Sequence, residues 1–255
     1  QGYSSAASDV YKRQRTYSLE DAAADVFVPS YVRTERGIRA TVRTPRIARE
    51  LMIPSPAVFN LSNALGAIAC AEALGISADA IETGLSRAYA PGRMELYPSE
   101  SGRIMGVVDY AHNGMSLETL LRDLRASYPD REFAVVFGAT GGKGVDRRET
   151  MGEAAGKLAD RIVITEDDPG PEDPALICDA IARAVSAQGN ENWRIVLDRS
   201  EAIRTAVSET HGPAVVIVTG KGNDPFMLRN GVREPYEPDG DQLRRALADW
   251  EREHV

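Results

Sequence analysis

The side chains best suited to chemistry lie in the segment 108–114, Val-Asp-Tyr-Ala-His-Asn-Gly. Asp109 and His112 directly follow an apolar run, residues 104–108, that is typical of a buried strand. In an open parallel sheet, ligands bind at the carboxyl ends of the strands, where such side chains would lie. Taken alone, the segment favours a plainer interpretation, in which Asp109 and His112 begin a turn and cap the next helix.

Three later apolar runs also end in loops rich in glycine or aspartate, at residues 137–144, 165–170 and 219–224. The carboxyl ends of parallel strands meet at one edge of a sheet. Four such loops on one edge therefore predict a ligand site there.

Beyond residue 93, strand and helix patterns alternate at βαβ spacing. The expected strands are residues 104–109, 133–137, 161–165, 193–197 and 214–219, and the expected helices are 116–127, 149–158, 174–187, 200–209 and 240–252. Strands this apolar are buried on both faces. Right-handed crossovers then predict an α/β fold with a doubly wound, Rossmann-like, mostly parallel sheet.

The residues before 92 have a different pattern. Three strands are expected at residues 25–32, 37–43 and 47–53, followed by helices at 61–75 and 77–87. Pro91 and Gly92 mark a boundary, so residues 15–92 and 93–255 are expected to be separate domains. Residues 1–14 end in Asp-Val-Tyr-Lys-Arg-Gln, which resembles a translated sequencing adaptor, and we interpret them as a non-native head. A genuine disordered amino terminus is the alternative.

Composition narrows the function classes. A formal net charge of −8 argues against nucleic acid or an anionic membrane as the main partner. No stretch approaches the roughly 18 apolar residues that a membrane helix needs, so no membrane insertion is expected. Cys70 and Cys178 lie in apolar helical patterns without metal-ligand spacing, which predicts two buried thiols in a reducing, cytoplasmic compartment.

The loop at residues 138–144 is glycine-rich but is not a nucleotide phosphate loop. A Walker sequence needs glycine five residues before Gly-Lys, and Phe137 occupies that position before Gly142 and Lys143. Thr140 stands at the second glycine of a dinucleotide fingerprint. The main phosphate cradle for a nucleoside triphosphate is therefore expected outside this chain.

Seven ordered motifs nevertheless resemble one family, the Mur ligases, and especially its UDP-N-acetylmuramoyl-tripeptide synthetases of the MurE type. The motifs are Phe-Asn-Leu-Ser-Asn-Ala at 59–64, Pro-Gly-Arg-Met-Glu at 91–95, Asp-Tyr-Ala-His at 109–112, Arg148 with Met-Gly at 151–152, Asp-Asp-Pro at 167–169, Glu-Asp-Pro at 172–174 and Gly-Lys-Gly at 220–222. The resemblance spans essentially residues 16–250.

The resemblance implies a three-domain, ATP-dependent amide ligase that works through an acyl phosphate. Residues 15–92 would be the last strands and helices of its P-loop central domain, and residues 93–255 the carboxyl-terminal domain that admits the amino acid. ATP and Mg²⁺ are the implied cofactors, and a UDP-N-acetylmuramoyl dipeptide and an amino acid the implied partners of a monomeric enzyme. The catalytic groups and metal ligands would lie upstream, so none is assigned here and the chain is expected to be an inactive fragment.

For ATP, the resemblance places Asn63 near the adenine, Arg93 near the phosphates or ribose, and Asp109 on the ribose hydroxyls. A carboxylate can accept both hydroxyl protons, and a guanidinium binds phosphate oxygens in a fixed fork. His112 would either pack near the ribose or hydrogen-bond within the turn. For Asn63 the alternative is a helix N-cap.

For the amino acid, the resemblance places Arg148 on the α-carboxylate, with a paired surface charge beside Asp146 or Glu149 as the alternative. Lys221 stays outside the core site. The other implied contacts are Asp167, Asp168, Gly170, Gly220 and Asp224.

Departures from the family pattern bear on the substrate. Diaminopimelate-adding members carry Asp-Asn-Pro-Arg, whose arginine binds the distal carboxylate, but this chain has Asp-Asp-Pro-Gly, ending in Gly170. The family's Gly-Lys-Gly-His-Glu also becomes Gly-Lys-Gly-Asn-Asp here, ending in Asp224. Crowded acidic residues in the segment 166–173 would repel a second carboxylate and attract an ammonium. The expected substrate is therefore L-lysine or L-ornithine.

Two alternatives remain open at this point. Folylpolyglutamate and cyanophycin synthetases share the domain architecture and would change the substrate. A domain that binds a nucleotide or a partner without chemistry would leave the enzyme class altogether.

Overall fold

The computed structural model describes residues 14–34 and 37–254. The interpretation of residues 1–14 as a non-native head lies, apart from Gln14, outside the described residues. The chain forms two compact units, Gln1–Tyr89 and Ala90–Val255. Their boundary precedes Pro91 and Gly92, and each unit is described by itself.

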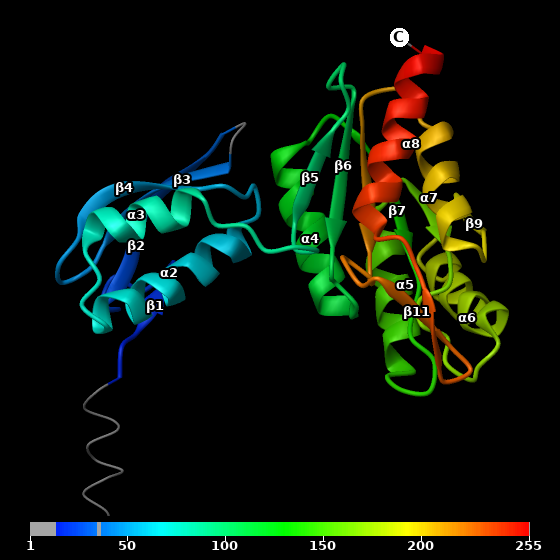
Figure 1. Ribbon diagram of the computed structural model, residues 1–255, viewed down its shortest axis with the longest axis horizontal. Helices are drawn as coiled ribbons and strands as arrows, with labels where there is room; N and C mark the ends of the chain where they lie inside the picture. Colours follow the sequence, from blue (N-terminus) through cyan, green and yellow to red (C-terminus); the bar gives the residue numbers. More distant parts are fainter. Residues whose placement is uncertain (1–13, 35–36, 255) are drawn as a thin grey trace, which may run out of the picture. The chain divides into compact units, whose positions relative to one another are not determined.

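The first unit is a four-stranded sheet covered by two helices (Figure 1). The strands, in spatial order, are β1 (Tyr17–Ser18), β2 (Val26–Thr34), β3 (Gly37–Arg43) and β4 (Ala48–Ile53). β1 runs parallel to β2, and the other neighbours are antiparallel. The helices are α2 (Val58–Ala73) and α3 (Ala78–Ser86). The three long strands and both helices were predicted, and only the two-residue β1 was missed.

The core of this unit follows the periods of its elements. Ile38, Ala40 and Val42 alternate along β3 onto one buried face, as strand geometry requires. Leu61 and Leu65, one helical turn apart on α2, belong to the same cluster.

One prediction about the cysteines is wrong. Cys178 is buried, but Cys70 is exposed. Ile68 and Ala69 complete the buried stripe of α2, and the next residue along the helix turns away from the sheet.

The second unit contains a six-stranded sheet in the order β5-β6-β10-β7-β8-β9. Its strands are β5 (Glu95–Pro98), β6 (Ile104–Asp109), β7 (Glu132–Phe137), β8 (Arg161–Ile164), β9 (Trp193–Ile195) and β10 (Ala214–Thr219). All neighbours are parallel except β5, which pairs antiparallel with β6. Every residue of β8 and β10 is buried, as the apolar runs predicted.

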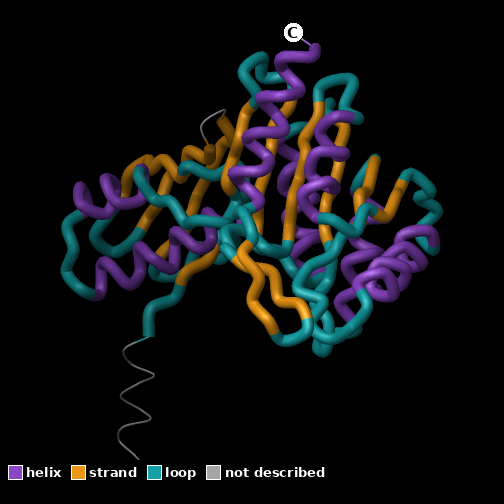
Figure 2. The backbone as a smooth tube through the Cα atoms, turned by 45° about the vertical axis from the view of Figure 1, so that its right-hand side comes forward, coloured by secondary structure: helices purple, strands orange, loops and turns teal. Residues whose placement is uncertain are grey.

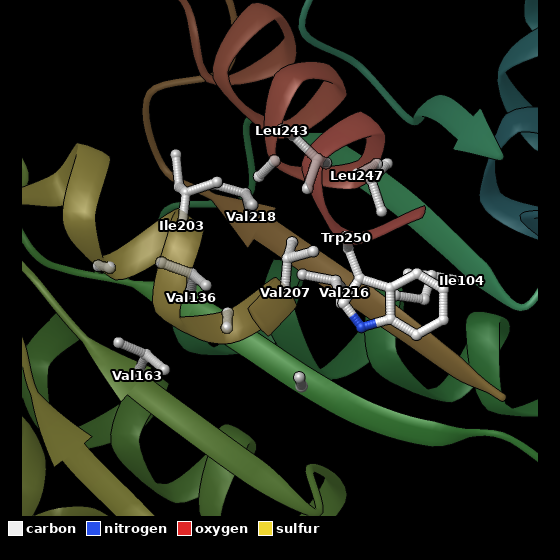
Figure 3. Packing of buried hydrophobic residues seen from close by; sticks show 14 of the residues in the cluster. Ile104, Val136, Val163, Ile203, Val207, Val216, Val218, Leu243, Leu247 and Trp250 are labelled. Atoms are coloured by element: carbon white, nitrogen blue, oxygen red, sulfur yellow. The ribbon is translucent and has the colours of Figure 1, made fainter. Parts of the chain in front are cut away.

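Helices cover both faces of this sheet, so the predicted doubly wound, mostly parallel fold is confirmed (Figures 1 and 2). The helices are α4 (Gly114–Ser127), α5 (Asp146–Leu158), α6 (Pro174–Ser186), α7 (Arg199–Ser208) and α8 (Asp239–His254). Figure 3 shows α7 and α8 packing on the strands through Ile203, Val207, Leu243, Leu247 and Trp250. None of the helices in the described part combines the length and apolar character needed to cross a membrane.

Two further features were not predicted. β5 is an edge strand, and β11 (Phe226–Arg229) pairs with β12 (Val232–Pro235) in a separate hairpin. Asn230 and Gly231 connect these strands with φ of 49° and 77°. The dipeptide Asn-Gly is a strong hairpin signal, so the sequence contained part of the information for this hairpin.

The strand order positions the site. β10, the last parallel strand, lies between β6 and β7, so the chain reverses its direction of winding at this point of the sheet. Ligands of doubly wound sheets bind outside the carboxyl ends of the strands at such a switch point.

Candidate functional site

The four predicted loops meet at the carboxyl edge of the sheet. The Gly220 amide donates to the Asp109 carbonyl oxygen at 3.3 Å, which joins the ends of β10 and β6. Lys221 Nζ lies 2.8 Å from Asp168 Oδ1, and the Gly141 amide donates to the Asp168 carbonyl oxygen at 3.0 Å. The structure thus brings together the loops that follow β6, β7, β8 and β10.

Two glycines allow the loops after β7 and β8 to pack backbone against backbone. A Cβ atom on Gly138 would overlap the Thr165 carbonyl oxygen, and one on Gly141 would overlap the Pro169 carbonyl oxygen. The glycine-rich segment therefore serves close loop packing, consistent with its failure to match a phosphate loop.

Asp109 is 7% exposed and binds two backbone amides. Its Oδ2 accepts from the Met94 amide and its Oδ1 from the Ala111 amide, each at 2.8 Å. Burial raises the pKa of Asp109 above its ordinary value, although both hydrogen bonds act in the opposite direction. Met94 has φ of 48°, a conformation that costs an L-residue free energy, and Asp109 holds it there. Each carboxylate oxygen keeps a second acceptor position.

Arg93 and His112 both lie against Tyr110. The exposed Arg93 guanidinium carbon is 4.6 Å from the centre of the Tyr110 ring. His112 Nδ1 lies 2.8 Å from the Tyr110 carbonyl oxygen, a hydrogen bond within the turn. The cap of α4 is Asn113, whose side chain accepts from the Ser116 amide. The interpretation of Asp109 and His112 as helix caps is therefore wrong.

Asn63 belongs to the first unit. It is exposed in the interior of α2, and its Nδ2 donates to Asn60 Oδ1 at 3.1 Å. Because α2 begins after Ala57, Asn63 is not an N-cap, and that alternative is wrong.

Arg148 is 9% exposed near the start of α5 and pairs with Glu172. Its Nη2 lies 2.9 Å from Glu172 Oε1 and 2.8 Å from Oε2. Glu172 also accepts from the Gly142 amide, and this bond together with Arg148 lowers the pKa of Glu172. The alternative pairing with Asp146 or Glu149 is wrong. Arg148 Nε is buried without a hydrogen-bond partner among the described residues, so one donor of the guanidinium has no acceptor.

The acidic segment 166–173 is not the uncompensated cluster that was expected. Four of its five carboxylates have partners: Arg229 for Glu166, Lys221 for Asp168, Arg148 for Glu172 and the Ala175 amide, at the start of α6, for Asp173. Three of these partners are cations, so the charges of Glu166, Asp168 and Glu172 are paired, and the expected uncompensated acidity applies to only part of the segment.

Asp167 is the exception. It is 4% exposed, and no hydrogen-bond donor from the described residues reaches its carboxylate. Burial raises the pKa of Asp167 to about 6, against the effect of Arg199 and Lys221. Arg199 already pairs with Asp239, and Lys221, 1% exposed, with Asp168. Asp167 is thus a buried carboxylate without a cation of its own.

The remaining predicted positions lie on the loops after β8 and β10. Gly220 has φ of 112°, and a Cβ atom there would overlap Asp167 Oδ2. Asp224 Oδ2 lies 3.7 Å from Lys221 Nζ. Gly170 has φ of 61°, its amide donates to the Leu228 carbonyl oxygen at 3.0 Å, and the space at its Cβ position is open.

The sequence did not single out the buried pair of Arg199 and Asp239, or Arg229 on the hairpin. Arg199 follows the helix cap Asp198, and from the sequence alone it reads as a surface charge in the first turn of a helix. Its guanidinium donates hydrogen bonds to three residues that lie far from it along the chain: Asp239, Thr219 and Glu166.

Comparisons with known proteins identify the relatives of this chain. The family described as "Mur ligase, glutamate ligase domain" matches residues 92–222. The UDP-N-acetylmuramoyl-L-alanyl-D-glutamate–L-lysine ligase of Enterococcus faecalis is 40% identical over 182 residues, 71% of this chain and 35% of that protein. The enzyme of the same name from Streptococcus thermophilus is 38% identical over 192 residues, 74% of this chain and 38% of that protein. The chain therefore spans a little over a third of the length of these relatives.

Solved structures share the architecture. A UDP-N-acetylmuramoyl-L-alanyl-D-glutamate–2,6-diaminopimelate ligase superposes with a TM-score of 0.63 at 26% identity, covering 94% of this chain and 48% of that one. A folylpolyglutamate synthase from Mycobacterium tuberculosis gives 0.66 at 21% identity, covering 78% and 46%, which shows the fold alone. The family match covers more than half of the chain and includes the loops after β6, β7 and β8 and the first residues of the loop after β10. The chain belongs to the Mur ligase family.

Proposed function

We propose that this chain supplies the amino-acid site of an ATP-dependent amide ligase that joins L-lysine or L-ornithine to UDP-N-acetylmuramoyl-L-Ala-D-Glu. In such a reaction the dipeptide carboxylate takes the γ-phosphoryl group of ATP and releases ADP. The amine of the incoming amino acid then attacks the acyl carbon, and inorganic phosphate leaves. The role of the residues described here is to bind and orient that amino acid.

The observation that carries the proposal is the unpaired buried carboxylate of Asp167. A buried charge without a partner is unfavourable, and an ammonium group of a ligand would supply the missing cation. Arg148, with its free Nε donor, would hold the α-carboxylate. A diamine bound at both ends in this way presents its α-amine, and not its distal amine, as the nucleophile.

Gly170 supports a substrate without a distal carboxylate. The position has no side chain that could bind one, and the neighbouring Arg229 already pairs with Glu166 and Glu234. A charge-assisted hydrogen bond contributes about 1.5–3 kcal/mol. Lack of a guanidinium here would therefore cost diaminopimelate roughly one to two decades of affinity. The names of the Enterococcus faecalis and Streptococcus thermophilus relatives, both L-lysine ligases, point the same way.

Arg93 and Asp109 would contribute to the nucleotide site. The Arg93 guanidinium is exposed, and Asp109 keeps an acceptor position on each oxygen, so both fit a ribose or phosphate ligand. ATP bound there supplies the phosphoryl group that activates the dipeptide carboxylate. No group of three or more His, Cys, Asp or Glu side chains in the described part of the chain could hold a metal ion.

The test is the ratio of kcat/KM values in a ligase that carries this chain as its amino-acid domain. L-lysine, L-ornithine and meso-diaminopimelate would be compared at saturating ATP and UDP-N-acetylmuramoyl dipeptide. We expect lysine or ornithine to be preferred by about tenfold or more. A comparable preference for diaminopimelate would contradict the proposal.

A further inference from the structure

A buried ion pair adjoins the loops that carry Asp167 and Gly220. Arg199, the first residue of α7, and Asp239, the first residue of α8, both have fully buried side chains. Arg199 Nε lies 2.9 Å from Asp239 Oδ1, and Nη2 lies 2.7 Å from Oδ2. The Tyr236 hydroxyl donates to Oδ1 at 2.8 Å. The pair thus forms a fixed unit between two helix starts.

The other donors of Arg199 reach the two loops. Nη2 donates to the Thr219 carbonyl oxygen at 2.8 Å, and Nη1 to the Glu166 carbonyl oxygen at 3.4 Å. Thr219 immediately precedes Gly220, and Glu166 immediately precedes Asp167. Because guanidinium donors are rigidly spaced, Arg199 sets the separation of these carbonyl groups.

That separation controls the place of the Asp167 carboxylate. Its Oδ2 occupies the space that a Cβ atom of Gly220 would need, so a small shift between the loops would move the carboxylate. Stability alone explains the ion pair poorly, because replacing a buried pair by apolar residues is often neutral or stabilising.

We propose that Arg199, oriented by Asp239, is a positioning residue of the amino-acid site. It clamps the loops after β8 and β10 together and so keeps the Asp167 carboxylate in place for the distal ammonium group of the ligand. This inference rests on the proposed function of Asp167.

Charge offers a second readout. The groups that act on Asp167 are Arg199, Lys221, Asp168 and Asp239, and Asp167 in turn acts on Tyr110. Arg199 lowers the pKa of Asp167 more than Asp239 raises it. Replacing both by neutral residues should therefore raise the pKa of Asp167 further, which a purely structural pair elsewhere in the molecule would not do.

Arg161 provides a matched control. It is also buried, it pairs with Glu132 at 3.0 Å, and its Nη1 donates to the Ala206 carbonyl oxygen at 3.0 Å. It begins β8, at the opposite edge of the sheet from Asp167. Arg161→Lys therefore reproduces the loss of a buried guanidinium without touching the site.

The experiment uses the full 255-residue chain and measures the Kd of L-lysine by calorimetry, with thermal unfolding in parallel. We expect Arg199→Lys to weaken L-lysine binding by about tenfold, because a single ammonium group cannot replace the several fixed donors of the guanidinium. Arg161→Lys should change the Kd by less than about twofold while lowering Tm to a similar extent. Equal Kd values for the two variants would overturn the inference.

The double variant Arg199→Gln with Asp239→Asn avoids a buried unpaired charge, and carbon-13 NMR would follow the Asp167 carboxyl through pH. A raised pKa of Asp167 supports the inference, and an unchanged one contradicts it. This measurement needs no ligand. If the unaltered chain failed to bind L-lysine, the proposed function would fail, and the titration would still judge the role of Arg199.

Discussion

At the scale of single residues, Asp167 should cost the chain stability at neutral pH. Its folded-state pKa, about 6, lies above the ordinary aspartate value of 3.8. Between about pH 4 and pH 6 the folded chain keeps a proton on Asp167 that the unfolded chain has lost. The free energy of unfolding is therefore highest below about pH 4 and falls as the pH rises through about 6. The shift corresponds to roughly 3 kcal/mol.

Asp167→Asn should therefore raise Tm by several degrees near pH 8 and leave it almost unchanged near pH 4, while weakening L-lysine binding by about tenfold or more. Thermal unfolding at both pH values checks the first part. Asp79→Asn, at an exposed residue paired with Arg49, is the control and should show no such pH dependence. A lower Tm for Asp167→Asn near pH 8 would mean that the carboxylate is satisfied after all.

Gly170 can be tested separately from its backbone strain. Its φ of 61° means that any L-residue costs about 1 kcal/mol, so Gly170→Ala measures the strain alone. Gly170→Arg adds a guanidinium, and we expect it to bind meso-diaminopimelate about tenfold more tightly than Gly170→Ala does. Equal affinities would exclude Gly170 as a specificity position. Asp168 should stay unchanged, because Asp168→Asn would remove the 2.8 Å partner of buried Lys221.

The single residues also show where sequence reasoning stops. Arg148, Asp167, Asp168, Gly170 and Gly220 were expected near one another, and they lie near the start of α5 and on two of the loops that meet. The ion pairs around them were not predictable, because each joins residues that are far apart along the chain: Arg148 with Glu172, Glu166 with Arg229 and Arg199 with Asp239. The sequence does not show whether an aspartate or glutamate is paired with a cation. Only the structure therefore distinguishes Asp167, which has no such partner, from its acidic neighbours.

At the scale of elements, the contact between the loops after β7 and β8 should depend on Gly141. A Cβ atom there would overlap the Pro169 carbonyl oxygen, so Gly141→Ala must push the loops apart. We expect a loss of about 2–3 kcal/mol in the free energy of unfolding, measured by urea denaturation. Gly142→Ala is the matched control, since it has φ of 73° and nothing within 4 Å, and it should cost only about 1 kcal/mol. Equal losses would show that backbone strain, and not loop contact, explains both.

The elements that were predicted share one property. The bounds of β3, β6 and β10 match the expected ones to the residue, because each shows a clear strand pattern: alternation along β3, and an apolar run along β6 and β10. β5 was missed because its segment, Glu-Leu-Tyr-Pro, is short, half-buried and at a sheet edge. β5 is held in the sheet by its hydrogen bonds to β6, and these cannot be read from the sequence of the segment itself.

At the scale of the whole molecule, the chain lacks a Walker sequence but presents Arg93 and Asp109 for a nucleotide. We expect the 255-residue chain to bind ATP weakly and to hydrolyse none. Calorimetry gives the affinity, and phosphate release with Mg²⁺ gives the hydrolysis rate. Magnesium-dependent ATPase activity of the pure chain would show that its phosphate cradle had been overlooked.

The central claim is that the carboxyl edge of the second unit selects an amino acid with a distal ammonium and no distal carboxylate. The most direct test is calorimetric titration of this chain, near pH 8, with L-lysine, with L-norleucine, which lacks the distal amine, and with meso-diaminopimelate. We predict that L-lysine binds at least about tenfold more tightly than either of the others, and that Asp167→Asn removes this advantage. Equal binding of L-lysine and L-norleucine, or tighter binding of meso-diaminopimelate, would contradict the account.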